Sequence, residues 1–199
     1  EHDDFQAHKD EMMQEVYQEV LDQGSKPYII PMGASNGIGT LGYIDAFDEI
    51  LEYEKKTGIV FDTIIDAVGS GGTYTGLYLG NVLRQTHKDI VGINVCDDAD
   101  FFIKEINRII DETLPHLDVE DVDRSHIHII DGYVGRGYSL SRKEELKAIS
   151  DLSRHSGIIL DPVYTGKAYY GLIHELEKGT FDHAKNILFM HTGGIYGLF

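Results

Sequence analysis

Short apolar segments alternate along the chain with longer segments in which apolar residues recur at helical spacing. The short segments are apolar at nearly every position, as strands are when both faces of a sheet are covered. They predict strands at residues 28–31, 61–68, 90–95, 127–130 and 186–191, with a short extended piece at 158–160. The longer segments predict helices at residues 2–23, 41–56, 73–85, 98–114, 141–154 and 165–178.

This alternation predicts an α/β fold, an open and mainly parallel sheet with helices on both faces. In such sheets ligands bind at the carboxyl ends of the strands, so the loops that follow strands are the expected place for chemistry. Four of these loops are rich in glycine or hydroxyl side chains, at residues 32–40, 69–73, 132–139 and 192–197. The 199 residues suit one domain with a sizeable core, or one large domain with part of a second.

The strongest local signal is the sequence Gly69-Ser70-Gly71-Gly72-Thr73, between a predicted strand and a predicted helix. Glycines let main-chain N–H groups approach an anion, and a helix start adds unpaired N–H donors and a positive dipole end. The loop holds no Lys or Arg, and neither a G-x-x-x-x-G-K-[ST] nor a G-x-G-x-x-G pattern runs through it. We therefore expect a neutral cradle for one phosphate monoester. The alternative is a plain strand–helix turn in which glycine serves tight packing.

A second glycine-rich segment, residues 33–42, also joins a predicted strand to a predicted helix. Ser35, Asn36 and exposed N–H groups there would hold a carboxylate or a phosphate, or else Ser35 or Asn36 simply caps the helix. Further along the chain, Asp97 or Asp98 is the expected cap of the helix at 98–114, and Asp161 before a proline predicts a fixed turn. Helix 141–154 is expected to be capped by one of two serines, Ser139 or Ser141.

Three segments together are more specific than general α/β patterning. They are Gly69–Thr73, Asp161-Pro162-Val163-Tyr164-Thr165-Gly166-Lys167 and His191-Thr192-Gly193-Gly194. In that order and spacing the chain resembles the D-cysteine desulfhydrase and 1-aminocyclopropane-1-carboxylate deaminase family, fold-type-II enzymes that use pyridoxal 5'-phosphate. Residues 33–42 and Gly135-Arg136-Gly137-Tyr138 resemble the family's pattern as well. The likeness runs over essentially all of residues 1–199, and it implies the cofactor-binding large domain of a tryptophan-synthase-β-like fold.

The resemblance implies a role for each of several residues. Gly69, Ser70, Gly71, Gly72 and Thr73 match the family's cup for the cofactor phosphate. Tyr164 matches a catalytic tyrosine that lies against the cofactor ring, and Tyr138 matches one that reaches toward the substrate. Thr192 matches a position near the pyridine nitrogen, and Thr165 is placed with Tyr138 at the substrate.

Two positions distinguish the activities within this family. The deaminase pattern has Glu after the motif tyrosine and Leu before the paired glycines, whereas this chain has Thr165 and Thr192 there. A hydroxyl cannot hold the ring nitrogen protonated as a carboxylate would, and a weaker electron sink suits β-elimination. D-Cysteine going to pyruvate, sulfide and ammonia is therefore the leading expectation. The alternatives are ring-opening deamination of 1-aminocyclopropane-1-carboxylate and, in another class, a catalytically inactive truncated cofactor- or phosphate-binding module.

The chain also departs from the family pattern. Arg136 and Ser139 stand where the family more often has Pro and Gly, which leaves the substrate open; an extra cation there would pair with a second acidic group, such as a sulfonate. The family's Gly-Gly-Asn-Lys-type motif with the Schiff-base lysine does not occur in this chain, nor does its Ser-Asn-His-type motif. Lys167 matches a position that is not the Schiff-base lysine. We expect residues 1–199 to be the C-terminal part of a longer enzyme and to be inactive by themselves.

Composition narrows the partners. With 17 Lys and Arg against 34 Asp and Glu the net charge is −17, which argues against nucleic acid and against an anionic membrane surface. No apolar run approaches a membrane span, and the first residues are unlike a signal peptide. The single cysteine, Cys96, favours the cytoplasm, and it is expected to be a buried strand-end thiol. His126 and His128 share one face of a strand without a third ligand, so no metal site is expected. The resemblance adds a small amino-acid substrate and a homodimer.

Overall fold

The structure is a computed structural model that describes residues 2–194 and 197. It contains two compact units, Glu1–Ala34 and Ser35–Phe199, which are described separately. The first unit holds helix α1 (His2–Asp22), as expected, and the short 3-10 helix η1 (Met32–Ala34). The strand predicted at residues 28–31 is wrong, because these residues have no regular secondary structure. A strand needs a neighbour to pair its main-chain groups, and the described residues of this unit supply none.

The second unit alternates strands and helices as the sequence predicts. Its strands are β1 (Thr63–Val68), β2 (Asp89–Asn94), β3 (His128–Ile130) and β4 (Ile187–Phe189). Its α-helices are α2 (Leu41–Thr57), α3 (Gly72–Arg84), α4 (Ala99–Thr113), α5 (Lys143–Ser156) and α6 (Thr165–Glu177), and the 3-10 helix η2 (Leu114–His116) follows α4. Each strand and helix predicted in this unit is present, with ends shifted by a few residues, whereas the short piece at 158–160 forms no strand.

The four strands form one sheet in the order β3-β2-β1-β4, and every neighbouring pair is parallel. In the central pair Ile64 lies beside Ile90 and Ile65 beside Val91. Because the strands are parallel, their carboxyl ends meet at one edge of the sheet. The loops after β1, β2, β3 and β4 therefore converge there.

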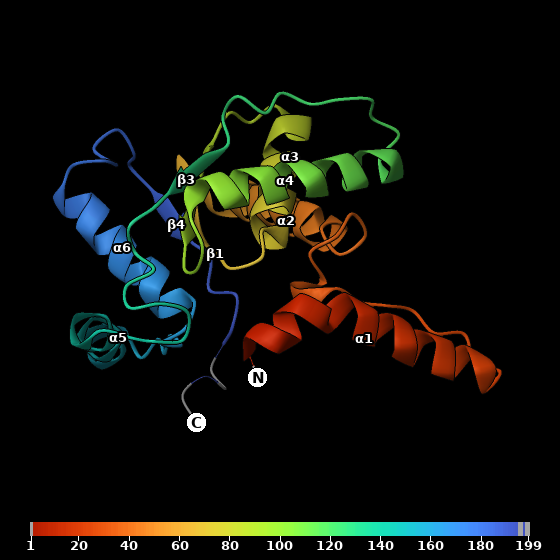
Figure 1. Ribbon diagram of the computed structural model, residues 1–199. Helices are drawn as coiled ribbons and strands as arrows, with labels where there is room; N and C mark the ends of the chain where they lie inside the picture. The colour runs from red at the N-terminus through yellow and green to blue at the C-terminus, as the bar shows by residue number, and fades with distance from the viewer. Residues whose placement is uncertain (1, 195–196, 198–199) are drawn as a thin grey trace. The chain divides into compact units, whose positions relative to one another are not determined.

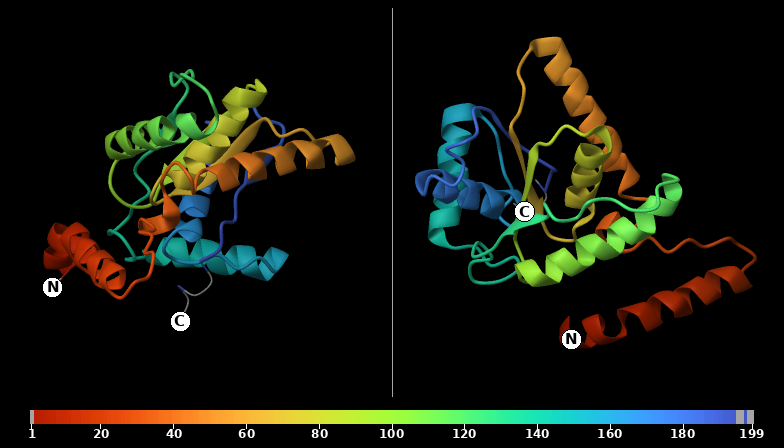
Figure 2. Two further views of the ribbon diagram at one scale, coloured as in Figure 1. Left: turned by 90° about the vertical axis from the view of Figure 1, so that its right-hand side faces the viewer. Right: turned by 90° about the horizontal axis from the view of Figure 1, so that it is seen from above.

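Helices cover both faces of the sheet, as expected (Figure 1). One face packs against α2, α3 and α4 through a core that includes Ile64, Val68, Phe47, Leu77 and Phe102, all with side chains almost or fully buried. The opposite face packs against α6 through a second core, with Ile65, Val91, Ala168 and Leu172 among its members. The two views of Figure 2 show the same layering, with α5 lying beside α6. Alternate strand residues supply the two cores, as the two-residue period of a strand requires.

The predicted helix caps have mixed outcomes. Asp98 caps α4, since its carboxylate accepts a hydrogen bond from Phe101 N at 2.8 Å. The prediction for α5 is wrong: the N-cap is Arg142, whose N–H donates to Glu145 Oε2 at 2.6 Å. Ser141 is used elsewhere, because its hydroxyl donates to Pro162 O at 3.0 Å.

None of the helices in the described part of the chain combines the length and the apolar character that crossing a membrane requires.

Candidate functional site

The loop Gly69–Thr73 lies where β1 passes into α3. Gly71 is the N-cap of α3 with a φ of +88°, and no side chain caps the helix. The N–H of Gly72 donates to Ser35 Oγ at 3.2 Å, whereas the N–H groups of Gly69, Ser70, Gly71 and Thr73 have no acceptor among the described residues. Four main-chain donors at a helix N-terminus are thus available to an anion.

Neighbouring side chains pack closely against the loop, so larger residues would not fit in place of its glycines. A Cβ at Gly69 would lie 3.1 Å from Cε1 of Tyr164, and one at Gly72 would lie 2.7 Å from Ser35 Oγ. Gly71 has a left-handed backbone that side chains rarely adopt. The donors of the whole loop are uncharged N–H and hydroxyl groups, which suit a phosphate monoester. The loop therefore fits the phosphate of the cofactor expected from the sequence.

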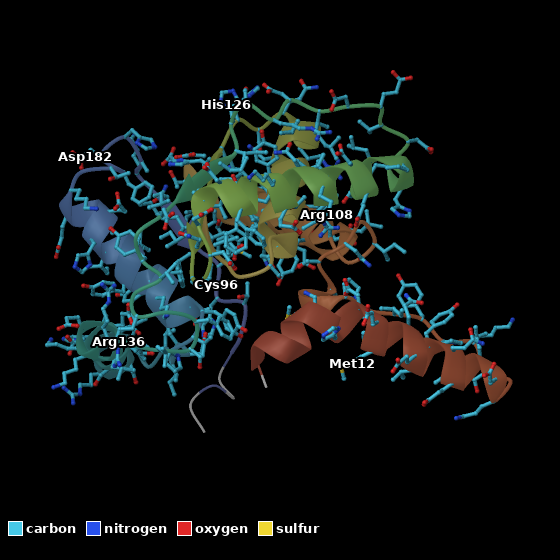
Figure 3. All side chains as sticks on the ribbon, viewed as in Figure 1. Met12, Cys96, Arg108, His126, Arg136 and Asp182 are labelled. Atoms are coloured by element: carbon cyan, nitrogen blue, oxygen red, sulfur yellow. The ribbon has the colours of Figure 1, made fainter. Side chains whose placement is uncertain are left out.

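The second glycine-rich segment lies against this loop through Ser35. The Ser35 hydroxyl donates to Ser70 Oγ at 2.7 Å, and Asn36 Oδ1 accepts from Gly39 N at 2.8 Å. Ser35 thus belongs to the cup, while Asn36 shapes the approach to α2. Residues 37–42 match the spacing G-x-G-x-x-G, but no described strand precedes them, so the context of a dinucleotide site is missing. Arg108 of α4, labelled in Figure 3, donates to the carbonyl oxygen of Ser35 at 3.4 Å.

Asp161 fixes the turn that carries Tyr164, as the sequence predicts. Its carboxylate is fully buried and accepts hydrogen bonds from Val163 N and Tyr164 N at 2.7 Å and from Thr165 N at 2.9 Å. The Thr165 hydroxyl donates to the same carboxylate at 2.6 Å. Because α6 begins at Thr165, the carboxylate caps this helix and places the Tyr164 ring against Gly69.

Thr165 itself lies inside the protein in this structure. Its side chain is fully buried, and its hydroxyl also accepts a hydrogen bond from Asp161 N at 3.1 Å. The contacts that the structure records for Thr165 therefore support the turn, and a contact between Thr165 and a substrate stays a prediction.

Tyr138 and Tyr164 form a pair at the edge of the sheet. Their hydroxyl groups are hydrogen-bonded to each other, and the rings meet edge to face with centroids 5.9 Å apart. Burial raises the pKa of Tyr164, and the hydrogen bond with Tyr138 raises it further. Tyr138 is 52% exposed and Tyr164 is half-buried, so the pair is open to solvent on the Tyr138 side. Either hydroxyl can hold or donate a proton.

The loop after β4 lies against the Asp161 turn. A Cβ at Gly194 would collide with the Asp161 carboxylate, and the His191 ring is hydrogen-bonded to Ile159 O at 2.9 Å. Thr192 is exposed and makes no hydrogen bond with any described residue. The structure therefore brings together the glycine loop, Tyr164 and Tyr138, whereas the role of Thr192 near a ring nitrogen stays a prediction.

Cys96 follows β2 at the same edge (Figure 3). Its thiol is partly buried and donates to Gly69 O at 3.6 Å. Burial raises the pKa of this thiol to about 12, with the nearby Asp97 adding to the shift. The thiol is therefore a packing group beside the glycine loop, as expected, since a thiolate is the reactive form.

Sequence reasoning missed an acid beneath the site. Asp66 lies in the middle of β1, is fully buried, and neither of its carboxylate oxygens has a hydrogen-bond partner among the described residues. Burial raises its pKa to about 8, so the carboxyl group is protonated near pH 7. The only signal in the sequence was a charged residue inside an otherwise apolar strand.

His126 and His128 lie at the other end of the sheet. His128 Nδ1 is 3.6 Å from Asp89 Oδ1 at the start of β2, and His126 lines a cavity of about 500 Å³ together with Asp89 and Tyr78. The described residues hold no group of three or more side chains suited to a metal ion. This end of the sheet is separate from the glycine loop, because β2 runs between the two.

Comparison with known proteins agrees with this geometry. The chain is 40% identical over 186 residues to a putative 1-aminocyclopropane-1-carboxylate deaminase of Pyrococcus abyssi, which covers 94% of this chain and 55% of that protein. It is 41% identical over 180 residues to the mitochondrial bifunctional D-cysteine desulfhydrase/1-aminocyclopropane-1-carboxylate deaminase of Arabidopsis thaliana, covering 89% and 44%. The crystal structure of a homologue of that deaminase superposes with a TM-score of 0.87 at 38% identity, covering 98% of this chain and 57% of the other.

The chain thus spans about half the length of the curated relatives it matches. The model of the family described as "Pyridoxal-phosphate dependent enzyme" matches residues 3–193, which include the glycine loop, both tyrosines and Thr192. This match confirms pyridoxal 5'-phosphate as the cofactor and bears out the resemblance found in the sequence. The chain belongs to the pyridoxal-phosphate dependent enzyme family.

Proposed function

We propose that the protein containing this chain is a lyase that eliminates the β-substituent of a small amino acid, with D-cysteine as the leading substrate. The observation that carries the proposal is the cup of four available N–H donors at Gly69–Thr73, with the Tyr164 ring packed on its first glycine. A cup for one phosphate beside an aromatic ring matches a phosphorylated pyridine better than it matches a nucleotide.

The chain's own residues divide the work in this proposal. The loop Gly69–Thr73 would bind the cofactor phosphate, and the Ser35 hydroxyl holds this loop through Ser70 and Gly72. Tyr164, held by Asp161, would pack against the cofactor ring. When bound, the cofactor supplies an electron sink for the negative charge that develops on the substrate. The proposal assigns removal of the α-proton to a lysine that is not part of this chain.

The tyrosine pair handles a proton near the β-substituent. A thiolate leaves more readily when a proton reaches the sulfur, and the hydrogen-bonded hydroxyls of Tyr138 and Tyr164 can supply one. The raised pKa of Tyr164 keeps its phenol protonated at pH 7. Tyr138 lies on the exposed side, where a small substrate enters. The two phenols share one hydrogen bond, so a proton that Tyr164 donates can be replaced from Tyr138.

The choice of β-elimination is supported by the side chain at position 165. A glutamate there would bring a carboxylate to the ring nitrogen, whereas the Thr165 hydroxyl is turned onto Asp161. With a hydroxyl in place of that carboxylate, this chain would leave the bound cofactor a weaker electron sink, which suits the loss of a β-leaving group. Thr192 is the proposed neighbour of that nitrogen.

The test is a product assay on the full-length protein with D-cysteine and with 1-aminocyclopropane-1-carboxylate as substrates. We expect pyruvate and sulfide in equal amounts from D-cysteine, and little 2-oxobutyrate from the cyclopropane. Tyr164→Phe keeps the ring and removes the phenol, so the turnover number should fall by roughly 100-fold or more. The matched control is Tyr53→Phe, since Tyr53 is a half-exposed tyrosine of α2 that stacks on Phe61. Equal rates for the two variants would contradict the proposed role of Tyr164.

Ring-opening deamination of 1-aminocyclopropane-1-carboxylate is the second candidate, because both relatives are named for that activity. If 2-oxobutyrate dominates the products, the deaminase activity replaces the desulfhydrase activity as the proposed function. A protein that binds the cofactor but turns over neither substrate would be the inactive binding module instead.

The proposal includes a homodimer in the cytoplasm with no nucleic-acid or membrane partner. The net charge of −17 supports the absence of a nucleic-acid or membrane partner, and the single cysteine supports the cytoplasm. The homodimer is what the family resemblance implies. Light scattering on the purified protein tests the dimer, and a monomeric mass at micromolar concentration would contradict it.

A further inference from the structure

Lys167 is a fully buried lysine in the first turn of α6, two residues after Thr165. Its ammonium group donates to Val134 O at 2.7 Å and to Gly137 O at 2.6 Å. Both carbonyls belong to the loop that leads from β3 to α5 and carries Tyr138. Lys167 therefore connects the helix that begins beside Tyr164 to the loop that carries Tyr138.

Main-chain hydrogen bonds within the loop run from Gly137 N to Val134 O at 3.4 Å and from Leu140 N to Gly137 O at 3.1 Å, and they leave several of its residues in unusual backbone conformations. Gly135, Gly137 and Ser139 have φ values of +71°, +129° and +60°, and Arg136 and Tyr138 on either side of Gly137 are exposed. Left-handed backbone at a serine is unfavourable, so contacts from outside the loop must maintain it. Packing supplies one such contact, since a Cβ at Gly135 would lie 2.6 Å from Glu145 Oε1.

A buried ammonium group is costly unless polar partners replace its water. Burial lowers the pKa of Lys167, and the charge of the buried Glu145 opposes that shift. Two of the three N–H bonds of Lys167 are committed to the loop, which leaves this amine poorly suited to attack a carbonyl group. Packing alone does not explain a lysine at this position. An apolar side chain of similar length would fill the same space without the cost of desolvating a charge.

We propose that Lys167 is a positioning residue that holds the Val134–Gly137 loop so that the Tyr138 hydroxyl meets the Tyr164 hydroxyl. Asp161 fixes Tyr164 from one side, and Lys167 fixes Tyr138 from the other. The pair is thus set by two buried charges on either side of the start of α6. That this pair acts on a substrate rests on the proposed function, while the coupling of Lys167 to the loop does not.

The first test uses trypsin on the protein without cofactor or substrate. The bond after Arg136, labelled in Figure 3, lies between the two carbonyls that Lys167 holds. Lys167→Met keeps the side-chain length and removes the donors, so cleavage there should accelerate by at least about ten-fold, because losing hydrogen bonds to a charged donor favours local opening by that order. Cleavage after the exposed Lys185 should not change. Lys147→Met, at an exposed lysine of α5, is the matched control.

The second test measures the tyrosine pair by NMR of protein labelled at the tyrosine ring carbons. The Tyr164 signal, assigned with Tyr164→Phe, should titrate above the ordinary pKa of tyrosine in the parent protein. In Lys167→Met it should move toward the ordinary value, because its partner phenol is no longer held. Lys167→Arg keeps the charge and the donors and should restore most of the protection at Arg136.

Two results would overturn the inference. Unchanged cleavage after Arg136 in Lys167→Met would show that Lys167 does not hold the loop, and equal acceleration after Lys185 would show a general loss of stability. If Lys167→Met does not fold, the shorter and uncharged Lys167→Gln takes its place with the same two criteria. Neither test uses the lyase reaction, so a protein that fails the product assay but meets these expectations loses the proposed function and keeps this inference.

Discussion

Replacing Asp161 by alanine removes a carboxylate that is fully buried and accepts four hydrogen bonds at 2.6–2.9 Å. Three of the donors are main-chain N–H groups that α6 and its preceding turn cannot satisfy otherwise. At about 1 kcal/mol for each of the three, the free energy of unfolding should fall by roughly 3 kcal/mol. Asp161→Asn keeps an acceptor but loses the charge, so its loss should be roughly half as large.

Asp98→Ala is the matched control, because Asp98 is an exposed helix cap whose carboxylate accepts from Phe101 N at 2.8 Å and from no other described residue. Its loss should be about 1 kcal/mol, the usual value for an N-cap. Urea unfolding followed by circular dichroism measures all the variants, and their dependence on urea should stay the same. If Asp161→Ala costs no more than Asp98→Ala, the argument that burial makes the Asp161 cap strong is refuted.

The remaining predictions concern the cup and two buried acids. Gly72→Ala places a methyl group against the Ser35 hydroxyl behind the cup, so the affinity for pyridoxal 5'-phosphate measured by calorimetry should fall by at least about ten-fold. Gly42→Ala is the control and should bind normally, because a Cβ there meets nothing within 4 Å. Equal affinities for the two variants would place the phosphate elsewhere. Burial raises the pKa of Asp66 to about 8, so the free energy of unfolding should fall as pH rises from about 4 toward 8, by up to roughly 1.4 kcal/mol per pH unit. Asp66→Asn should remove this dependence, and parallel pH profiles for the two proteins in urea unfolding would contradict it. Burial alone would raise the pKa of Glu175, but hydrogen bonds led by that from Lys178 lower it to about 2, so stability should be lost as pH falls from about 4.5 toward 2. Glu175→Gln should reduce this loss of stability at acid pH, measured as the change of thermal unfolding temperature with pH. An unchanged loss would show that other carboxylates cause it.

The incorrect predictions have a common physical cause. The apolar run at 28–31 has the composition of a strand, yet it has no neighbouring strand among the described residues of its unit. Ser139 and Ser141 are good caps by type, but Ser141 is used by Pro162 O and Ser139 has a φ of +60° in the loop before α5. In each case the local preference was real, and a contact from elsewhere in the fold, or the lack of one, decided the outcome.

Some features of this protein follow from local sequence alone. The alternation of apolar strands and amphipathic helices predicts the parallel sheet and its two helical layers, because side-chain burial follows the periods of strand and helix. Glycines at 69, 71 and 72 predict the anion cup, since glycine best permits that backbone beside a helix start. Asp161 likewise predicts its own turn, because an aspartate carboxylate reaches N–H groups only a few residues away.

The tertiary structure alone determined which distant groups meet. Lys167 and Gly137 are 30 residues apart, and Tyr138 and Tyr164 are 26 apart, so no local pattern connects them. The same holds for Asp66, whose ionisation depends on the helices that exclude water from its strand. Hydrogen bonding and burial depend on distance in space, and chain folding brings together residues that sequence spacing keeps apart.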